Sequence, residues 1–283
     1  MMKGKGFVIK TMERAEIDLA VEWAAREGWN PGLHDAACFY AADREGFLLG
    51  SLDGEPVGCV SAVKYGQGYG FLGFYIVAPE YRGRGLGIQL WRAAMDRLAG
   101  RNIGLDGVLA QQENYRKSGF RLAYQNARYE GVDLAGGRVS DRVAPLAEMD
   151  FAAVADYDGA VFGTDRAAFL RAWVAQPEGV ALGYRRGDRL AGYGVLRPCR
   201  QGFKIGPLFA DDGAVADELF TALAARAGGE PVYLDVPEAN AAALDVVRHY
   251  RMKMVFATAR MYSQHVPAVP LEKVFGVTTF ELG

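Results

Sequence analysis

The chain has 283 residues, of which 51% are hydrophobic and 23% are charged, an ordinary balance for a soluble globular protein. This length exceeds the usual size of one domain, so two domains are the first expectation. The net charge of −2 gives no electrostatic footprint for nucleic acid or for an anionic membrane surface. No segment approaches 18 uninterrupted apolar residues and the start lacks the apolar core of a signal peptide, so we expect a cytoplasmic protein with neither a nucleic-acid nor a membrane partner.

Cysteine and histidine are sparse in this chain. The three residues of each type are widely spaced, at Cys38, Cys59, Cys199, His34, His249 and His265. This spacing suits a reducing compartment and indicates neither a disulfide framework nor a zinc site. No metal is expected.

Strand and helix signals alternate through the first half. Residues 47–52 and 57–63 are strand-like runs around Asp53-Gly54, which is a hairpin signal. Residues 71–77 are apolar apart from one glycine and rich in aromatic and β-branched types, so they predict a buried strand. From residue 88 to residue 98, apolar side chains recur at helical spacing.

A glycine-rich turn, Arg82-Gly83-Arg84-Gly85-Leu86-Gly87, lies between this strand and this helix. Glycines let the backbone approach a ligand, and the free N–H groups of a first helical turn favour an anion, most naturally a pyrophosphate. The spacing fits neither the Rossmann fingerprint nor a P-loop, because the required third glycine and the Gly-Lys-Ser/Thr ending are missing. A glycine-rich turn without a ligand is the alternative.

The order Arg82-x-x-Gly85-x-Gly87 resembles the acyl-CoA signature of the GCN5-related N-acetyltransferases (GNAT), Gln/Arg-x-x-Gly-x-Gly/Ala. The preceding Tyr75-Ile76-Val77-x-Pro79 is similar to that family's fourth strand and its exit. The resemblance implies that strand N–H groups hold the pantetheine arm and polarise the thioester, while the turn holds the pyrophosphate. The cofactor-binding residues it implies are Tyr75, Ile76, Val77, Arg82, Gly83, Arg84, Gly85, Leu86, Gly87 and Ile88.

Tyr115 is the proton donor that the resemblance implies, because Tyr115-x-x-x-Gly119-Phe120 looks like the family's segment after the fifth strand. A phenol with a pKa near 10 can protonate a leaving thiolate of similar basicity. An amphipathic tyrosine that packs its ring under the helix is the alternative. One departure is Val108, which stands where family members often place an asparagine that binds pantetheine.

The general base is left open by the sequence. Many family members use a carboxylate on the fourth strand, and residues 71–77 contain none. Asp106, at the end of a predicted strand, is the first candidate, although it could equally cap the following turn. Glu113 and His34 are weaker alternatives.

Acceptor recognition is expected at the loop that holds Trp29 and Asn30, with Asp35 and Phe39 beyond it. In the family fold this segment joins the first two helices and borders the acceptor cleft. A tryptophan flanked by turn residues could cover a small substrate, or it could simply anchor the core.

The chain repeats its pattern. Residues 180–184 and 190–196 flank Gly187-Asp188 in the same way as the first hairpin flanks Asp53-Gly54. Both halves continue through a strand, a helix and a short strand that ends in Leu-Asp, at Asp106 and Asp235. Each half then closes with a similar segment, in which Ala127-Arg128 matches Ala259-Arg260. Several matches in one order predict two tandem α/β units.

The second unit lacks the glycine-rich turn. Residues 206–213 replace it, and the expected helix 214–225 carries Asp217 and Glu218 in its first turns, where carboxylates repel a pyrophosphate. We therefore expect a degenerate second domain without a CoA site, which walls off the acceptor pocket or holds the catalytic half in shape.

The fold expected is α/β: two tandem GNAT-like domains, each a mixed and mostly antiparallel sheet flanked by helices. Residues 1–132 form the catalytic domain and residues 138–283 the degenerate one. The function expected is an acyl-CoA N-acyltransferase that uses acetyl-CoA and passes the acyl group directly to a small primary amine. The competing reading is a non-catalytic acyl-CoA sensor or partner-binding module. The oligomeric state is left open.

Overall fold

The computed structural model describes residues 6–134 and 140–283. In the first half, the strands are β1 (Phe7–Thr11), β2 (Phe47–Leu52), β3 (Glu55–Tyr65), β4 (Tyr69–Val77), β5 (Asn102–Val108) and β6 (Arg121–Gly131), and the helices are α1 (Arg14–Arg26), α2 (Asp35–Ala42), α3 (Leu86–Arg97) and α4 (Gln112–Lys117). The predicted hairpin, the buried strand and the helix after the glycine turn are confirmed as β2–β3, β4 and α3.

The second half repeats this order. Its strands are β7 (Val143–Pro145), β8 (Val180–Arg186), β9 (Arg189–Pro198), β10 (Phe203–Ala210), β11 (Val232–Pro237), β12 (Lys253–Tyr262) and β13 (Val274–Gly276), and its helices are α5 (Phe151–Phe162), α6 (Ala167–Trp173), α7 (Gly213–Ala224) and α8 (Ala241–His249). The second predicted hairpin is β8–β9, and the helix expected after residue 213 is α7. The mixed α/β class and the tandem arrangement are confirmed.

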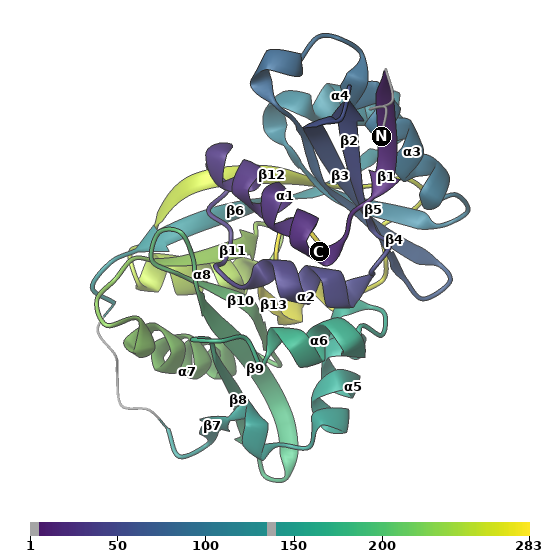
Figure 1. The fold of residues 1–283 in the computed structure, drawn as a ribbon. Helices are drawn as coiled ribbons and strands as arrows, with labels where there is room; N and C mark the ends of the chain where they lie inside the picture. Colours follow the sequence, from purple (N-terminus) through teal and green to yellow (C-terminus); the bar gives the residue numbers. More distant parts are fainter. Residues whose placement is uncertain (1–5, 135–139) are drawn as a thin grey trace.

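The two halves share one continuous 13-stranded sheet, ordered β1-β2-β3-β4-β5-β12-β6-β11-β10-β9-β8-β7, with β13 paired to β10. The order shows that the halves exchange their late strands. β12 from the second half pairs with β5, and β6 from the first half pairs with β11. Figure 1 shows β12, near the yellow end of the colour scale, passing beside β6 into the first half. Each half therefore needs the other to complete its sheet.

The exchanged strands carry the two Ala-Arg pairs of the sequence repeat. Arg260 on β12 lies opposite Asp106 on β5, and Arg128 on β6 lies opposite Asp235 on β11. The predicted boundaries at residues 132 and 138 stay a prediction, and residue 138 lies outside the described residues. A cut between them would separate strands that are hydrogen-bonded to one another.

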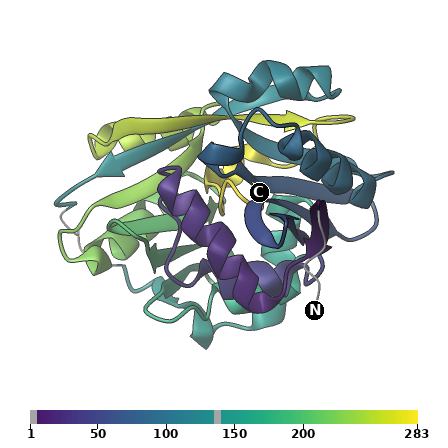
Figure 2. The same cartoon turned by 45° about the horizontal axis from the view of Figure 1, so that its top comes forward.

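Aromatic side chains form the core where the halves meet. Phe39 on α2 is fully buried, and its ring centroid lies 6.1 Å from Trp173 of α6 and 5.5 Å from Phe74 of β4. Phe39, expected near the acceptor, is thus a core residue between the halves. The chain ends inside this region, since Leu282 is fully buried, and Figures 1 and 2 both place the C-terminus at the centre of the molecule.

In the described part of the chain, no helix has the length and apolarity needed to cross a membrane. The same residues contain no group of three or more His, Cys, Asp or Glu side chains placed to hold a metal ion. The three cysteines are free and buried.

Candidate active site

A slot opens where β4 and β5 separate. The strands are paired in parallel from Tyr69↔Asn102 to Leu72↔Leu105, and no pairing continues beyond that point. On its other edge β4 bulges against β3, and Phe74 at the bulge has a φ of 46°, a conformation that a bulky residue adopts only where the fold requires it. The β5-facing edge of the rest of β4 is left with backbone groups that a ligand can satisfy. The pocket at this slot has a volume of about 490 Å³.

The glycine turn closes one end of the slot and opens onto free space. Gly83 and Gly85 have φ values of 74° and 75°, in the left-handed region that favours glycine. A Cβ added to either residue would have no heavy atom within 4 Å. Gly85 is also the N-cap of α3 and provides no side chain to the first-turn N–H groups, which leaves them free for an anion.

Gly87 has a different role, because it lets α3 pack closely on β4. A Cβ at this position would lie 2.8 Å from the Tyr75 hydroxyl oxygen and 3.2 Å from Cγ2 of Val77. The helix N-terminus is therefore held directly beside the open end of β4. Ile88 follows in the first turn and is 46% exposed.

The other residues predicted in this turn divide between the pocket and its support. Arg82 lines the pocket, but its Nε donates to the Val77 carbonyl at 2.8 Å and its Nη2 bonds Glu27, so it ties β4 to the end of α1. Arg84 lies over the ring of Tyr81 at 5.4 Å, and Leu86 is buried. The predicted cofactor residues that line the pocket are Tyr75, Ile76, Val77, Arg82, Gly83, Gly85, Gly87 and Ile88; Arg84 and Leu86 do not line it.

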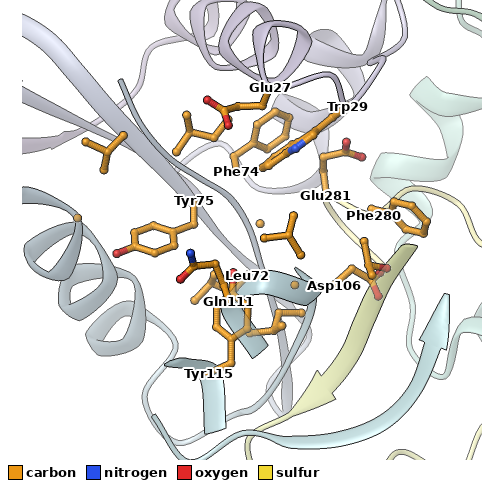
Figure 3. A pocket seen from close by; sticks show the side chains of 18 of the residues that line it. Glu27, Trp29, Leu72, Phe74, Tyr75, Asp106, Gln111, Tyr115, Phe280 and Glu281 are labelled. Atoms are coloured by element: carbon orange, nitrogen blue, oxygen red, sulfur yellow. The ribbon is translucent and has the colours of Figure 1, made fainter. Parts of the chain in front are cut away.

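The ring of Tyr115 on α4 reaches the pocket because Gly107 on β5 has no side chain to block it. A Cβ on Gly107 would lie 2.2 Å from Cε2 of Tyr115, so the tyrosine ring lies flat against β5. Trp91 packs on the ring with a centroid distance of 5.6 Å. Burial, with a smaller contribution from Tyr75, raises the pKa of Tyr115 to about 12. The phenol therefore keeps its proton throughout the physiological pH range and remains available as a donor (Figure 3).

Asp106 also lines the pocket, but both carboxylate oxygens have strong partners. Arg260 donates to them at 2.9 and 2.6 Å, and the side-chain amide of Asn126 donates to Oδ1 at 2.7 Å. The Asp106 side chain is completely buried. This arrangement favours a structural role for Asp106, and its role as general base stays a prediction.

The side of the pocket where the acceptor is expected has aromatic walls from both halves. They are Trp29 after α1, Phe74 on β4, Phe256 on β12 and Phe280 near the C-terminus. The carboxylate of Glu281 lies on the same side as Trp29 and Phe280 (Figure 3). Thr258 also lines the pocket, and its buried hydroxyl has no hydrogen-bond partner within the described residues.

The structure separates the three predicted acceptor residues. Trp29 lines the pocket, whereas Asn30 and Asp35 do not. The Asn30 side chain exchanges two hydrogen bonds with the backbone of Gln201, at 2.9 and 3.0 Å. Asp35 is buried and accepts from Nε of Arg197 at 2.9 Å. Both residues fasten the Trp29 loop to the second half.

The pocket residues from the second half were absent from the sequence predictions: Phe256, Thr258, Phe280 and Glu281. The second half was expected to bind no CoA and to wall off the acceptor pocket or support the catalytic half, without particular residues being assigned to the pocket. The only available signal was the match between the closing segments of the two halves.

The corresponding slot of the second half is filled by the chain itself. β10 and β11 pair in parallel only from Phe203↔Val232 to Ile205↔Leu234, and beyond that point β13 pairs with β10. A Cβ on Gly276 of β13 would lie 2.6 Å from Cδ1 of Leu234 on β11. β13 thus occupies the space that remains open between β4 and β5.

In the second half, a side chain of the protein itself binds the free N–H groups at the start of α7. Asp212 caps α7 by accepting from the N–H of Val215 at 3.0 Å. The hydrogen bond from Arg186, followed by that from Val215, lowers the pKa of Asp212. A carboxylate that stays ionised at this terminus replaces an anionic ligand.

Comparisons with known proteins agree with this geometry. Residues 14–120 match the model of the acetyltransferase (GNAT) family, and residues 154–276 match a second acetyltransferase (GNAT) domain model. The holothin acyltransferase of Pseudoalteromonas sp. (strain SANK 73390) is 33% identical over 284 residues, which cover 100% of this chain and 97% of that protein. The chain belongs to the GNAT acetyltransferase family.

Solved structures show the same tandem GNAT fold. A putative acetyltransferase from Pyrococcus horikoshii superposes with a TM-score of 0.84 at 23% identity, covering 99% of this chain and 97% of that one. A tandem GNAT protein from the clavulanic acid biosynthesis pathway has a TM-score of 0.63 at 14% identity, covering 93% and 99%. The protein is therefore an enzyme of the GNAT acyltransferase class, and the sensor reading has no support from these relatives.

Proposed function

We propose that this enzyme transfers an acetyl group from acetyl-CoA to the nitrogen of a small primary amine. The observation that carries the proposal is the slot between β4 and β5, which ends at the open glycine turn and whose counterpart in the second half is filled by β13. The N–H groups of residues 83–88 would hold the pyrophosphate, and the free edge of β4 from Tyr75 to Val77 would hold the pantetheine arm. The space above Gly83 and Gly85 fits a bulky anion close to the backbone.

A short acyl group suits this site because the end of the chain limits the space over β4. A Cβ on Gly73 would lie 2.1 Å from the Glu281 carbonyl oxygen, so the C-terminal segment passes directly over this strand. The slot beyond the thioester position is thereby narrowed. Because this contact limits the length of the slot, we propose that the donor carries an acetyl group rather than a longer acyl group.

The aromatic walls indicate the body of the acceptor. Trp29, Phe74, Phe256 and Phe280 offer ring faces and edges that pack well against a flat, apolar substrate. The homologue from Pseudoalteromonas carries its acceptor, holothin, in its name. We therefore propose an acceptor with a flat ring system that carries the amine, rather than a polyamine.

Tyr115 would donate its proton to the leaving thiolate. Its hydroxyl stays protonated below a pKa of about 12, and its ring is fixed between Gly107 and Trp91. Asp106 would act as a positioning residue that orders β5 and β12 rather than as the base.

The direct test is a thiol-release assay with the purified protein, acetyl-CoA and a panel of amines: holothin, benzylamine, spermidine and free amino acids. We expect turnover with the ring-bearing amines, with the N-acetyl product identified by mass spectrometry. Parallel assays with hexanoyl-CoA should be slower. Turnover of hexanoyl-CoA alone would overturn the acetyl assignment, and no turnover with any amine would overturn the acceptor class.

A further inference from the structure

The last residues of the second half form a strap across the active site of the first. After β13, the N–H of Val277 donates to the carbonyl of Asp235 at 2.8 Å. The hydroxyl of Tyr65 on β3 donates to the carbonyl of Leu282 at 3.0 Å. Gly73 on β4 leaves room for the strap, because any side chain there would collide with the Glu281 carbonyl. The strap, residues 277–283, is held at both ends.

Three carboxylates line the pocket, and two of them are committed to cations. Glu27 pairs with Arg82, and Asp106 forms a bidentate pair with Arg260. Glu281 is only 4% exposed and has no ion pair within the described residues. Its carboxylate accepts a hydrogen bond from the Thr279 hydroxyl, which in turn accepts from the Glu281 N–H at 2.9 Å. Glu281 is thus the pocket carboxylate with capacity left for a substrate.

The arginines that face Glu281 from the second half and from β6 are paired with aspartates. The pKa of Arg128 is raised: burial opposes its charge, but Asp235 and, less strongly, Glu281 outweigh that effect. The pKa of Arg197 is also raised: burial opposes its charge, but Asp35, its main partner, outweighs that effect. The titratable groups of this cluster are Arg128 on β6, Asp35 on α2, Arg197 and Cys199 at the end of β9, Lys204 on β10 and Asp235 on β11.

We propose that Glu281, supplied by the C-terminal strap, binds the amino group of the acceptor and takes its proton. The inference rests on the proposed N-acyltransferase function and adds a residue to that site. Its position between Trp29 and Phe280 places a carboxylate among aromatic walls, where a cationic amine would otherwise have no counter-charge. The second half then contributes chemistry to the reaction rather than support alone.

The proton and electron balance of the step is complete with groups already named. The ammonium passes one proton to the Glu281 carboxylate, and the neutral nitrogen attacks the thioester carbonyl. The C–N bond forms and the nitrogen loses its second proton as the C–S bond breaks. The sulfur leaves with the bonding electron pair and takes the proton of Tyr115, and the second proton of the nitrogen restores the Tyr115 phenol. Glu281 then releases its proton to solvent, and the net products are an amide, a thiol and one proton.

The test compares Glu281→Gln with the wild type and with Glu272→Gln, a control on an exposed carboxylate of the same C-terminal segment. With benzylamine at pH 7, we expect kcat/KM of Glu281→Gln to fall about 100-fold, within the usual range for loss of a general base. The deficit should shrink as the pH rises, because the free amine then forms without help. The affinity for acetyl-CoA, measured by calorimetry, should stay within about twofold. Glu272→Gln should match the wild type in all three measurements.

A counter-charge role is the alternative, in which Glu281 only helps to balance the buried Arg128. Glu281→Gln would then unfold at a lower temperature and lose the same factor at every pH, which would overturn the proposal. Equal activity of Glu281→Gln and wild type would also overturn it while leaving the N-acyltransferase function intact. Absence of wild-type turnover with every amine would instead contradict the proposed function itself, and the assignment of Glu281 with it.

Discussion

Asp106 on β5 and Arg260 on β12 lie 154 residues apart in the sequence and form a bidentate ion pair with distances of 2.9 and 2.6 Å. Asp235 and Arg128 repeat this pair in the other half, at 2.6 and 2.8 Å. In each pair the aspartate comes from one half and the arginine from the other. The two pairs therefore lock the exchanged strands in register, and they do so beside the active site.

Removing one member of the first pair should destabilise the protein. Asp106→Asn leaves the Arg260 guanidinium buried without a counter-charge, and such losses cost about 3–5 kcal/mol. We expect this change in urea unfolding, followed by circular dichroism. Asp245→Asn, which removes an exposed pair with Arg248, should leave the urea midpoint unchanged. If Asp106→Asn were as stable as the wild type but inactive, the sequence prediction that Asp106 is the general base would be restored.

A negative charge at the first turn of α3 should weaken acetyl-CoA binding without harming the fold. Ile88 is exposed at the helix N-terminus, where an aspartate stabilises the helix but repels a pyrophosphate. Ile88→Asp should bind acetyl-CoA about 10- to 100-fold more weakly than Ile88→Asn, which has the same shape without the charge. Calorimetry measures both affinities. Equal affinities would place the pyrophosphate elsewhere.

Tyr115→Phe should lower kcat by about 100-fold while leaving the dissociation constant of acetyl-CoA nearly unchanged, because a proton donor acts mainly in the transition state. Wild-type activity should show no alkaline loss from this phenol until the pH approaches its pKa of about 12. Steady-state kinetics and calorimetry separate the two quantities. Tyr40→Phe, on α2 outside the pocket, is the matched control. Equal losses of kcat in both variants would remove Tyr115 from the chemistry.

Local features of the site could be predicted from the sequence, whereas the particular residues by which the second half completes the pocket could not. The glycine turn and Tyr115 depend on short-range patterns, and residues near each other in the chain fix them. The strand exchange has no such signature. Because both halves carry an Ala-Arg segment in their closing strand, Asp106 would face such a segment whether that strand came from its own half or from the other half. Phe256 enters the pocket on β12 through this choice, which the whole sheet determines, and Glu281 enters it on the C-terminal segment that passes over β4.

Stability should fall at alkaline pH through the buried tyrosines. The pKa of Tyr115 is raised by burial to about 12, so the folded state holds a proton that the unfolded chain releases near pH 10. The stability linked to this proton is complete below pH 10 and is lost as the pH rises toward 12, a change on the order of 2–3 kcal/mol. Urea midpoints measured from pH 8 to pH 11.5 should drop, and the drop should be smaller in Tyr115→Phe. Identical slopes would contradict the burial of this phenol.

One molecule of acetyl-CoA should bind per chain. β13 fills the second slot by pairing with β10, and Asp212 occupies the helix terminus that a pyrophosphate would need. Titration calorimetry with acetyl-CoA should give a stoichiometry near one in the wild type and no detectable binding in a variant that combines Ile88→Asp with Gly85→Asp. A stoichiometry of two would mean that β13 leaves its slot when the ligand arrives. Residual binding in the double variant would locate the site in the second half, and the open slot between β4 and β5 would then need another ligand.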